Sequence, residues 1–161
     1  MSDPTPARRF AAGAIGVPGE RAFYLEVDSD QDRTWYAVEK AQVAALGAEG
    51  TQLLAELGFA GAGAELVIDE VSEPTDVAFR VGEIMLIYSE ESGLVTITLR
   101  GGEEMDVAVW AVTPAQLDAL AAQGLRAVAS GRTACPRCGL AMDPEGHVCP
   151  TTNGDLRGHR P

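Results

Sequence analysis

Four residues near the C-terminal end have the side chains and the spacing of a zinc site. They follow the pattern Cys-x2-Cys-x8-His-x-Cys and are Cys135, Cys138, His147 and Cys149. The Cys-Pro-Arg-Cys-Gly turn brings two thiolates to one side, and residues i and i+2 of an extended segment point the same way. Three thiolates and one imidazole are a ligand set that zinc prefers in structural sites. The sequence therefore predicts bound Zn²⁺.

A set of four protein ligands predicts a structural role for this zinc ion. Catalytic zinc sites keep one coordination position open for water, and four protein ligands leave none. A redox Cys-x2-Cys pair is the competing interpretation, but it needs a strand–helix context that this segment lacks and leaves His147 and Cys149 unexplained. His159 is a weaker alternative ligand because it lies farther along the chain.

The rest of the chain lacks the common catalytic motifs. It has no histidine before the C-terminal tail and no P-loop, GxSxG or HExxH motif. The Gly-rich stretch at 58–63 follows a predicted helix and precedes no clear one, which argues against a phosphate cradle. The pairs Glu90-Glu91 and Glu103-Glu104 fall in predicted turns, where we interpret them as solubilising charges, with a cation-binding or catalytic carboxylate pair as the alternative. We predict no catalytic or cofactor-binding residues beyond the zinc ligands.

Composition and charge narrow the classes of partner. The 161 residues are 46% hydrophobic, enough to form a core, and carry a formal net charge of −12. Residues 23–125 contain 19 acidic against four basic residues, whereas residues 126–161 contain three acidic residues against five arginines. An acidic body argues against binding to nucleic acids or anionic membranes, which need a cationic surface. The arginine-rich tail is the segment for which contact with nucleic acid stays open.

The sequence predicts a cytoplasmic protein that does not engage membranes. No run approaches the roughly 18 apolar residues of a membrane-spanning helix. The first residues, MSDPTPARRF, lack the apolar stretch of a signal peptide. Three cysteines, an odd number, favour metal binding over a disulfide framework.

An internal repeat with an offset of 74 residues organises the chain. The segment AVEKAQVAAL at 37–46 aligns with AVTPAQLDAL at 111–120, with six identical positions of ten. The same offset pairs Tyr36 with Trp110, and many such positions in one register indicate a duplication. Chance similarity between two alanine-rich helices is the competing interpretation.

Each copy has the pattern of three strands followed by a helix. Hydrophobic residues alternate in the strands, as in Phe23, Leu25 and Val27. The predicted strands span 9–15, 21–27 and 34–38 in the first copy and 77–88, 93–100 and 105–112 in the second. The first helix is expected over 39–57, and the second begins at Thr113, whose side chain forms a capping box with Gln116.

The predicted fold class is α+β: tandem pseudo-symmetric β-β-β-α repeats, antiparallel meanders each covered by a helix, plus a small C-terminal zinc-binding ribbon. Whether the strands form one sheet or two stays open. The expected organisation is a disordered N-terminal tail at 1–8, the first repeat at 9–58, a linker at 59–75, the second repeat at 76–130 and the zinc ribbon with its tail at 131–161.

Two pairs of residues at equivalent positions of the repeat each allow two structural interpretations. Gly50 and Gly124 lie in the middle of the two helices, where glycine is costly. They indicate either a close approach of the helices or a helix break. Tyr36 and Trp110 are expected in the core or on a sheet face, with a symmetric aromatic contact surface as the alternative.

Three segments resemble a known family. They are GAIGVPGERAFYLEV at 13–27, FRVGEIML at 79–86 and CPRCGLAMDPEGHVCPTTNG at 135–154. Together they are similar to an uncharacterised actinobacterial family, a domain of unknown function, over nearly the whole chain. The resemblance transfers no catalytic residues. It implies a shared pathway with a histidine-phosphatase-like protein and a phosphoinositide-kinase-like protein, which are encoded beside members of the family.

These observations predict a zinc-stabilised, non-enzymatic protein-interaction or adaptor module, which acts with a protein partner. One alternative is an enzyme or small-ligand-binding protein with its site between the two repeats. A further alternative is nucleic-acid contact through the arginine-rich zinc ribbon.

Overall fold

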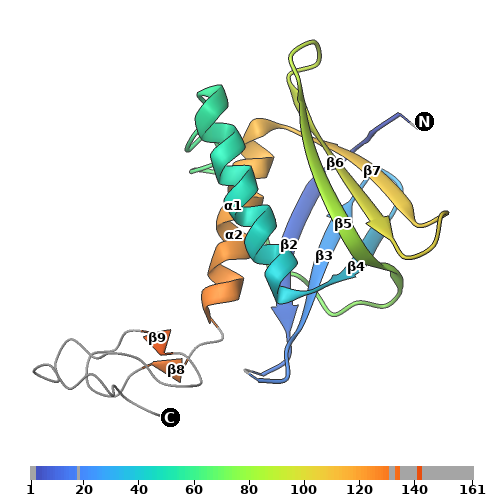
Figure 1. Cartoon of the computed structure of the whole chain (residues 1–161), viewed down its shortest axis with the longest axis vertical. Coiled ribbons are helices and arrows are strands. Elements are labelled where there is room, and N and C mark those ends of the chain that lie inside the picture. Colours follow the sequence, from blue (N-terminus) through green and yellow to red (C-terminus); the bar gives the residue numbers. More distant parts are fainter. Residues whose placement is uncertain (1–2, 18, 131–132, 135–140, 143–161) are drawn as a thin grey trace, which may run out of the picture.

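A computed structural model of the chain describes residues 3–17, 19–130, 133–134 and 141–142. This part is mixed α+β, with a seven-stranded sheet and two helices, as Figure 1 shows. The strands of the sheet are β1 (Thr5–Pro6), β2 (Arg9–Ile15), β3 (Ala22–Asp28), β4 (Arg33–Val38), β5 (Val77–Ser89), β6 (Leu94–Gly101) and β7 (Val107–Val112). The helices are α1 (Lys40–Leu57) and α2 (Pro114–Ser130), and a separate antiparallel pair consists of β8 (Thr133–Ala134) and β9 (Ala141–Met142).

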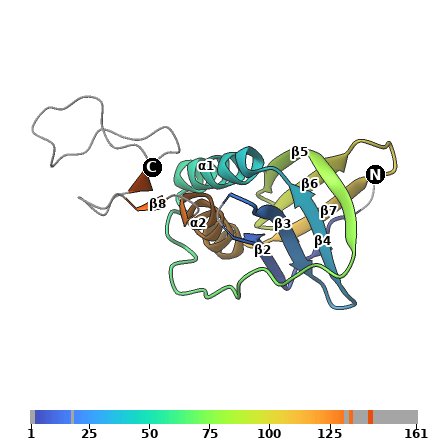
Figure 2. The same ribbon diagram turned by 90° about the horizontal axis from the view of Figure 1, so that it is seen from below.

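The strands form one continuous sheet in the order β1-β7-β6-β5-β4-β3-β2, which answers the question left open by the sequence. The pairs β4–β5 and β1–β7 are parallel, and the other neighbours are antiparallel. At the N-terminus, the backbone N–H of Ala7 donates to the carbonyl of Ala111 at 2.9 Å, and that of Arg8 donates to Asp28 at 2.7 Å. The first residues thus join the two outer edges, so the sheet curls on itself (Figure 2). The expectation of a disordered tail is therefore wrong for residues 5–8, because their backbone is paired with β7 and β3.

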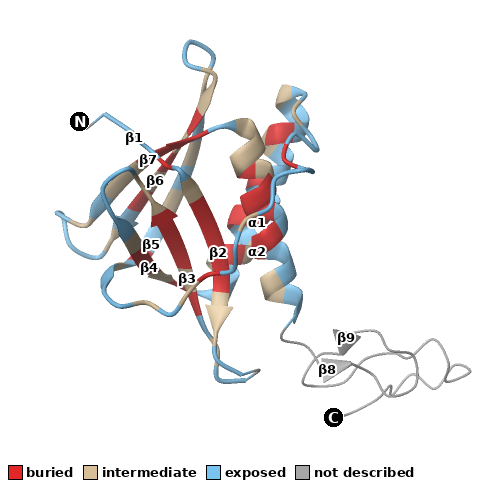
Figure 3. Cartoon of the chain, turned by 180° about the vertical axis from the view of Figure 1, so that it is seen from behind, coloured by how far each residue is buried: buried red, intermediate tan, exposed pale blue. Residues whose placement is uncertain are grey.

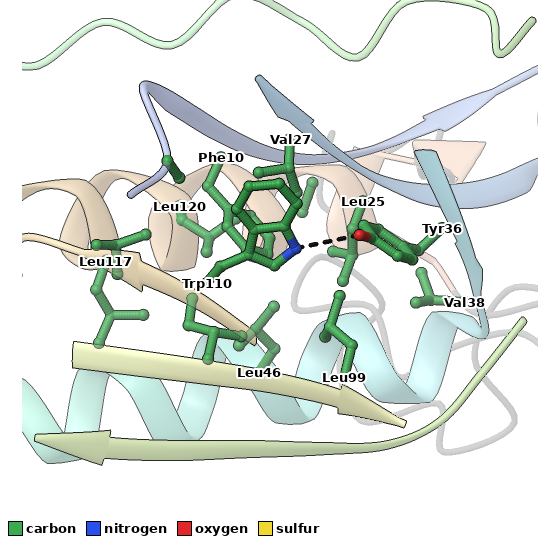
Figure 4. Packing of buried hydrophobic residues seen from close by; sticks show 14 of the residues in the cluster. Phe10, Leu25, Val27, Tyr36, Val38, Leu46, Leu99, Trp110, Leu117 and Leu120 are labelled. Atoms are coloured by element: carbon green, nitrogen blue, oxygen red, sulfur yellow. Dashed lines mark hydrogen bonds between the residues drawn. The ribbon is translucent and has the colours of Figure 1, made fainter. Parts of the chain in front are cut away.

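Tyr36 and Trp110 meet inside the curled sheet. The indole Nε1 of Trp110 donates a hydrogen bond to the Tyr36 hydroxyl at 3.1 Å, as Figure 4 shows. Strands β5 and β6 separate β4 from β7 in the sheet order, so this bond crosses the interior. Both side chains are buried, which confirms core packing and makes the aromatic contact surface wrong. Burial raises the pKa of Tyr36, and the bond from Trp110 lowers it by less.

The two helices are antiparallel neighbours that pack closely through their glycines. A Cβ atom on Gly50 would lie 3.2 Å from a methyl carbon of Leu117, and one on Gly124 would lie 3.1 Å from Val43. A Cβ on Gly47 would lie 2.6 Å from the side chain of Leu125. Both helices continue through their glycines, so the close approach is confirmed and the helix break is wrong.

The expectation that each helix covers its own meander holds only in part. Helix α1 packs mainly against α2 and meets β5 of the following strands, whereas α2 packs mainly against β2 at the start of the chain and also meets β6 and β7 of its own copy. The reason is the curled sheet, which brings β2 next to the end of β7 and therefore under α2. The predicted capping box of α2 is confirmed, because Gln116 Oε1 accepts from the Thr113 N–H at 2.8 Å and Thr113 Oγ1 accepts from the Gln116 N–H at 3.0 Å.

Most predicted elements are found within a few residues of their expected bounds. Strands β2, β3 and β4 precede α1, and strands β5, β6 and β7 precede α2. The inward-facing residues of these strands and the apolar faces of both helices form one hydrophobic core. The predicted linker at 59–75 contains no helix or strand, but part of it packs against the sheet.

Candidate functional site

An apolar groove of about 810 Å³ lies on the outer face of β5, β6 and β7. Because side chains alternate along a strand, the residues that do not enter the core line this face. The N-terminal residues Asp3–Thr5 and the β6–β7 turn close its rim. The floor is formed by Met85 and Ile87 from β5, Thr96 and Thr98 from β6, and Val107 and Val109 from β7.

Several apolar side chains of the groove are exposed to solvent. Ile87 is 55% exposed, Val107 is 41% exposed and Met105 in the β6–β7 turn is 93% exposed. Exposed apolar side chains that stand singly are ordinary, but a contiguous group around a groove is typical of an interaction site. Its few polar groups are hydroxyls and charges at the rim, so the groove is suited to apolar side chains of a ligand.

The outer face of β2, β3 and β4 differs because a segment of the chain covers it. Residues 66–75, which we call the strap, run across these strands between α1 and β5 (Figures 2 and 3). Val71 of the strap packs with Ala11 and Trp35 into a second hydrophobic cluster, and Ile68 lies against it. A Cβ on Gly13 would lie 3.1 Å from Val71, so glycine at this position lets the strap approach β2.

A buried carboxylate holds the strap in place. Glu26 of β3 is fully buried and accepts hydrogen bonds from the N–H and the hydroxyl of Ser72, both at 2.7 Å. It also forms an ion pair with Arg9 of β2, whose guanidinium donates to the carbonyls of Asp69 and Glu70. Burial alone would raise the pKa of Glu26, but the bonds from Ser72 and Arg9 together lower it below its ordinary value.

Two further polar side chains bind the backbone of the strap. The indole Nε1 of Trp35 donates to the carbonyl of Ser72 at 3.0 Å. The buried amide of Gln123 in α2 accepts from the N–H of Ala12 at 2.9 Å and donates to Asp69 at 3.2 Å. Sequence reasoning missed Arg9, Glu26 and Gln123 as a group. The buried polar residues of this face are thus used to hold the chain together.

The Gly-rich stretch is shaped by an aspartate of α2. The backbone N–H groups of Gly61 and Gly63 donate to the carboxylate of Asp118, at 3.3 and 2.9 Å. A Cβ on Gly63 would lie 2.2 Å from the backbone oxygen of Ala115, so only glycine fits there. Because a carboxylate of the chain already occupies these N–H groups, they are not available to a phosphate, in agreement with the sequence analysis.

A second hollow of about 430 Å³ lies at the start of α1. Three basic residues line it: Arg21 beside β3, Lys40 at the beginning of α1 and Arg80 of β5. Arg21 donates to the carbonyl of Ala127 in α2, and Arg80 forms an ion pair with Glu39. These contacts use part of the positive charge, and Lys40 is exposed.

The four predicted zinc ligands, Cys135, Cys138, His147 and Cys149, lie outside the described residues, as does His159. Within the described ranges, no group of three or more His, Cys, Asp or Glu residues is arranged to hold a metal ion. The acidic pairs at 90–91 and 103–104 are exposed at the β5–β6 and β6–β7 turns, as expected of solubilising charges. None of the described helices is long and apolar enough to cross a membrane.

Comparison with known proteins places the chain in a family without assigning an activity. No curated protein and no solved structure matches it. A family model with the description "Protein of unknown function (DUF3090)" matches residues 4–149, which include the whole sheet, both helices and all four predicted zinc ligands. The chain therefore belongs to the DUF3090 family.

Proposed function

We propose that the protein is a zinc-stabilised, non-enzymatic protein-interaction module whose contact surface is the groove on β5, β6 and β7. The observation that carries this proposal is the exposure of Met85, Ile87, Met105 and Val107 around one hollow of about 810 Å³. Apolar side chains on a rigid sheet suit the side chains of a protein partner. The buried side chains of Glu26 and Gln123 bind other parts of the chain, which fits a structural role for them.

A duplication accounts for the presence of two equivalent sheet faces, one of which is covered by the strap while the other is open. The parallel pairs Ala37–Arg80 and Ala111–Pro6 are related by 74 residues at both positions. Helix contacts are reciprocal in the same way: Gly50 meets Leu117, and its equivalent Gly124 meets Val43, the equivalent of Leu117. Reciprocal contacts of this kind are typical of twofold symmetry. They support pseudo-symmetric repeats at 9–58 and 76–130.

The ladder registers refine this alignment. Phe23 pairs with Val38 in the first half, and Val95 pairs with Val112 in the second, so β3 and β6 are related by 72 residues while their neighbours are related by 74. The difference arises because the β5–β6 turn is shorter and the β6–β7 turn longer than their counterparts. With these offsets, Ala11 corresponds to Met85 and Trp35 to Val109, so the groove occupies the place that the strap covers in the first half.

Capture from the native cell tests the proposed function. The comparison uses the wild-type chain, Ile87→Asn in the groove and Val67→Asn on the strap, where Val67 is 89% exposed and outside the groove. A partner that is retained by Val67→Asn and lost by Ile87→Asn would support the proposal. A partner retained by both variants, or turnover of a small molecule by the purified chain, would refute it. A phosphatase-like or a kinase-like protein is the expected partner class.

The zinc ion belongs to this proposal as a structural element of residues 131–161. We expect about one zinc ion per chain, held by Cys135, Cys138, His147 and Cys149. Metal analysis of the purified wild-type chain and of Cys138→Ser checks this expectation. Zinc that is absent from the wild type, or fully retained by Cys138→Ser, would contradict it.

The basic hollow at the start of α1 favours a second candidate, a small anionic ligand bound between the two halves. It combines Arg21 and Lys40 from the first half with Arg80 from the second. Calorimetric titration with inorganic phosphate and a nucleotide, on the wild type and Lys40→Ala, distinguishes this candidate from the protein-interaction module. Nucleic-acid contact through the arginines after residue 130 remains a separate alternative, which salt-dependent binding would support.

A further inference from the structure

The strap shows what kind of ligand an outer face of this sheet accepts. It is an extended segment that crosses three strands without joining the sheet. Ile68 and Val71 supply its apolar contacts, and hydrogen bonds from side chains of the sheet reach its backbone. It is also acidic, because it contains Asp69, Glu70 and Glu73. The face that it covers carries two cations. Arg9 donates to the backbone carbonyls of Asp69 and Glu70, and the pKa of Arg33 is raised by its hydrogen bond to Asp28 and, among other charges, by that of Asp69.

The two cations of the covered face are absent at the equivalent positions of the open face. With the offset of 74 residues, Glu83 stands where Arg9 binds the strap, and Val107 stands where Arg33 lies. Asp3 and Glu104 add two carboxylates at the rim of the groove. Arg100 is the cation of the groove, it lies opposite Glu83 in the β5–β6 ladder, and it forms no ion pair among the described residues.

We propose that the groove on β5, β6 and β7 binds an extended segment of a partner protein that combines apolar side chains with lysine or arginine. The apolar side chains of the bound segment lie on Met85, Ile87 and Val109. In the same way, Ile68 and Val71 of the strap lie on the covered face. The basic side chains lie against Asp3 and Glu104 at the rim of the groove, whose carboxylates attract cations, on a chain with a formal net charge of −12. This inference rests on the proposed function, because it names the partner chemistry of the same groove.

Two matched peptides test the chemistry of the occupant. The first has the strap sequence, Leu-Val-Ile-Asp-Glu-Val-Ser-Glu-Pro-Thr, and the second carries lysine at its three acidic positions. Each is labelled with fluorescein, and its binding to the full-length protein is followed by fluorescence anisotropy at about 50 mM and about 500 mM salt. We expect the basic peptide to bind at least about tenfold more tightly than the acidic one at low salt, and to lose this advantage at high salt.

Three variants locate the peptide on the protein. Ile87→Asn and Glu104→Lys are expected to weaken binding of the basic peptide by about fivefold or more, because both change exposed side chains of the groove. Glu56→Lys makes the same charge change at an exposed position of α1 and is expected to leave binding within about twofold. Equal binding of both peptides, no binding, or equal loss in all three variants would overturn the proposal.

Two results would assign the groove to another occupant and overturn the proposal. The first is a wild-type dimer in sedimentation velocity that Ile87→Asn dissociates, which would place a second copy on the face. The second is a basic peptide that binds only after Leu140 and Met142 are changed to asparagine, which would place this chain's own C-terminal residues there. Loss of the native partner on Ile87→Asn together with no peptide binding would leave the interaction module standing and refute only the basic class of ligand.

Discussion

Replacing Glu26 by alanine is expected to lower the free energy of unfolding by about 3–5 kcal/mol. The carboxylate is fully buried. It accepts hydrogen bonds from the N–H and the hydroxyl of Ser72 and forms an ion pair with the Arg9 guanidinium. Its removal leaves the Ser72 N–H without an acceptor and leaves Arg9, whose side chain is only 16% exposed, with Asp28 at 3.5 Å as its remaining carboxylate. A largely buried ion that loses its closest partner accounts for most of the expected loss, and the orphaned N–H adds to it.

Urea unfolding followed by tryptophan fluorescence measures this loss. Trp35 lies under the strap and Trp110 lies in the core, so local release of the strap and global unfolding both change the signal. Glu26→Gln keeps the shape but removes the charge and is expected to fall between wild type and Glu26→Ala. Glu56→Ala, an exposed glutamate on α1, is the matched control and should change stability by less than about 0.5 kcal/mol. A loss below about 1 kcal/mol for Glu26→Ala would refute the role of Glu26 as the anchor of the strap.

Three further outcomes follow from the packing. Because the pKa of Glu26 is lowered on folding, its stabilisation is present above the pKa of the unfolded chain, about 4.3, and is lost as the pH falls through the folded value. Urea unfolding from pH 7 to pH 3 should therefore show a steeper loss for wild type than for Glu26→Gln, and parallel curves would contradict this. Gly63→Ala should cost about 1–3 kcal/mol in thermal unfolding because its Cβ meets the backbone of α2, whereas Gly102→Ala, with open space around it, should cost little. Tyr36→Phe should cost about 1–3 kcal/mol by leaving the buried indole N–H unpaired, and an unchanged unfolding midpoint would show that this N–H finds another acceptor.

Local patterns predicted the elements well because each has a signal within a few residues. Alternation of Phe23, Leu25 and Val27 marks a half-buried strand, and Thr113 with Gln116 marks the start of α2. Gly50 and Gly124 indicated either a close helix contact or a helix break, because glycine in mid-helix has a cost, and the structure shows the contact. The element order along the chain was predictable for the same reason.

Arrangement in space was harder to predict because it depends on residues far apart in sequence. The sheet curls because residues 5–8 join β7 to β3, and nothing in this short N-terminal segment indicates such a role. Glu26 alternates with core residues, a pattern typical of a position that faces solvent, but the strap buries it. The predicted linker carries Ile68 and Val71, whose spacing is compatible with either packing or exposure. An apolar outer face at Ala11 and Trp35 was the one available sign of a covering segment.

The metal site stays a prediction, because its residues lie outside those that the structure describes. Its ligands are predicted from spacing alone, since thiolates and imidazole at Cys-x2-Cys and His-x-Cys intervals are typical of metal sites. The groove, in contrast, consists of ordinary strand residues such as Met85, Thr98 and Val109, and only the register of three strands brings them together. A contact surface built in this way is visible in the structure and not in a motif.

Photo-cross-linking inside the native cell shows directly whether the groove on β5, β6 and β7 contacts a protein partner. The full-length protein carries benzoylphenylalanine in place of Met85 in the groove or, as a control, in place of Val67 on the strap. After irradiation, mass spectrometry identifies the molecule joined to each position. We expect a protein adduct at position 85 that is absent at position 67 and contains a basic, apolar segment. The same adducts at both positions, or none at position 85, would contradict it.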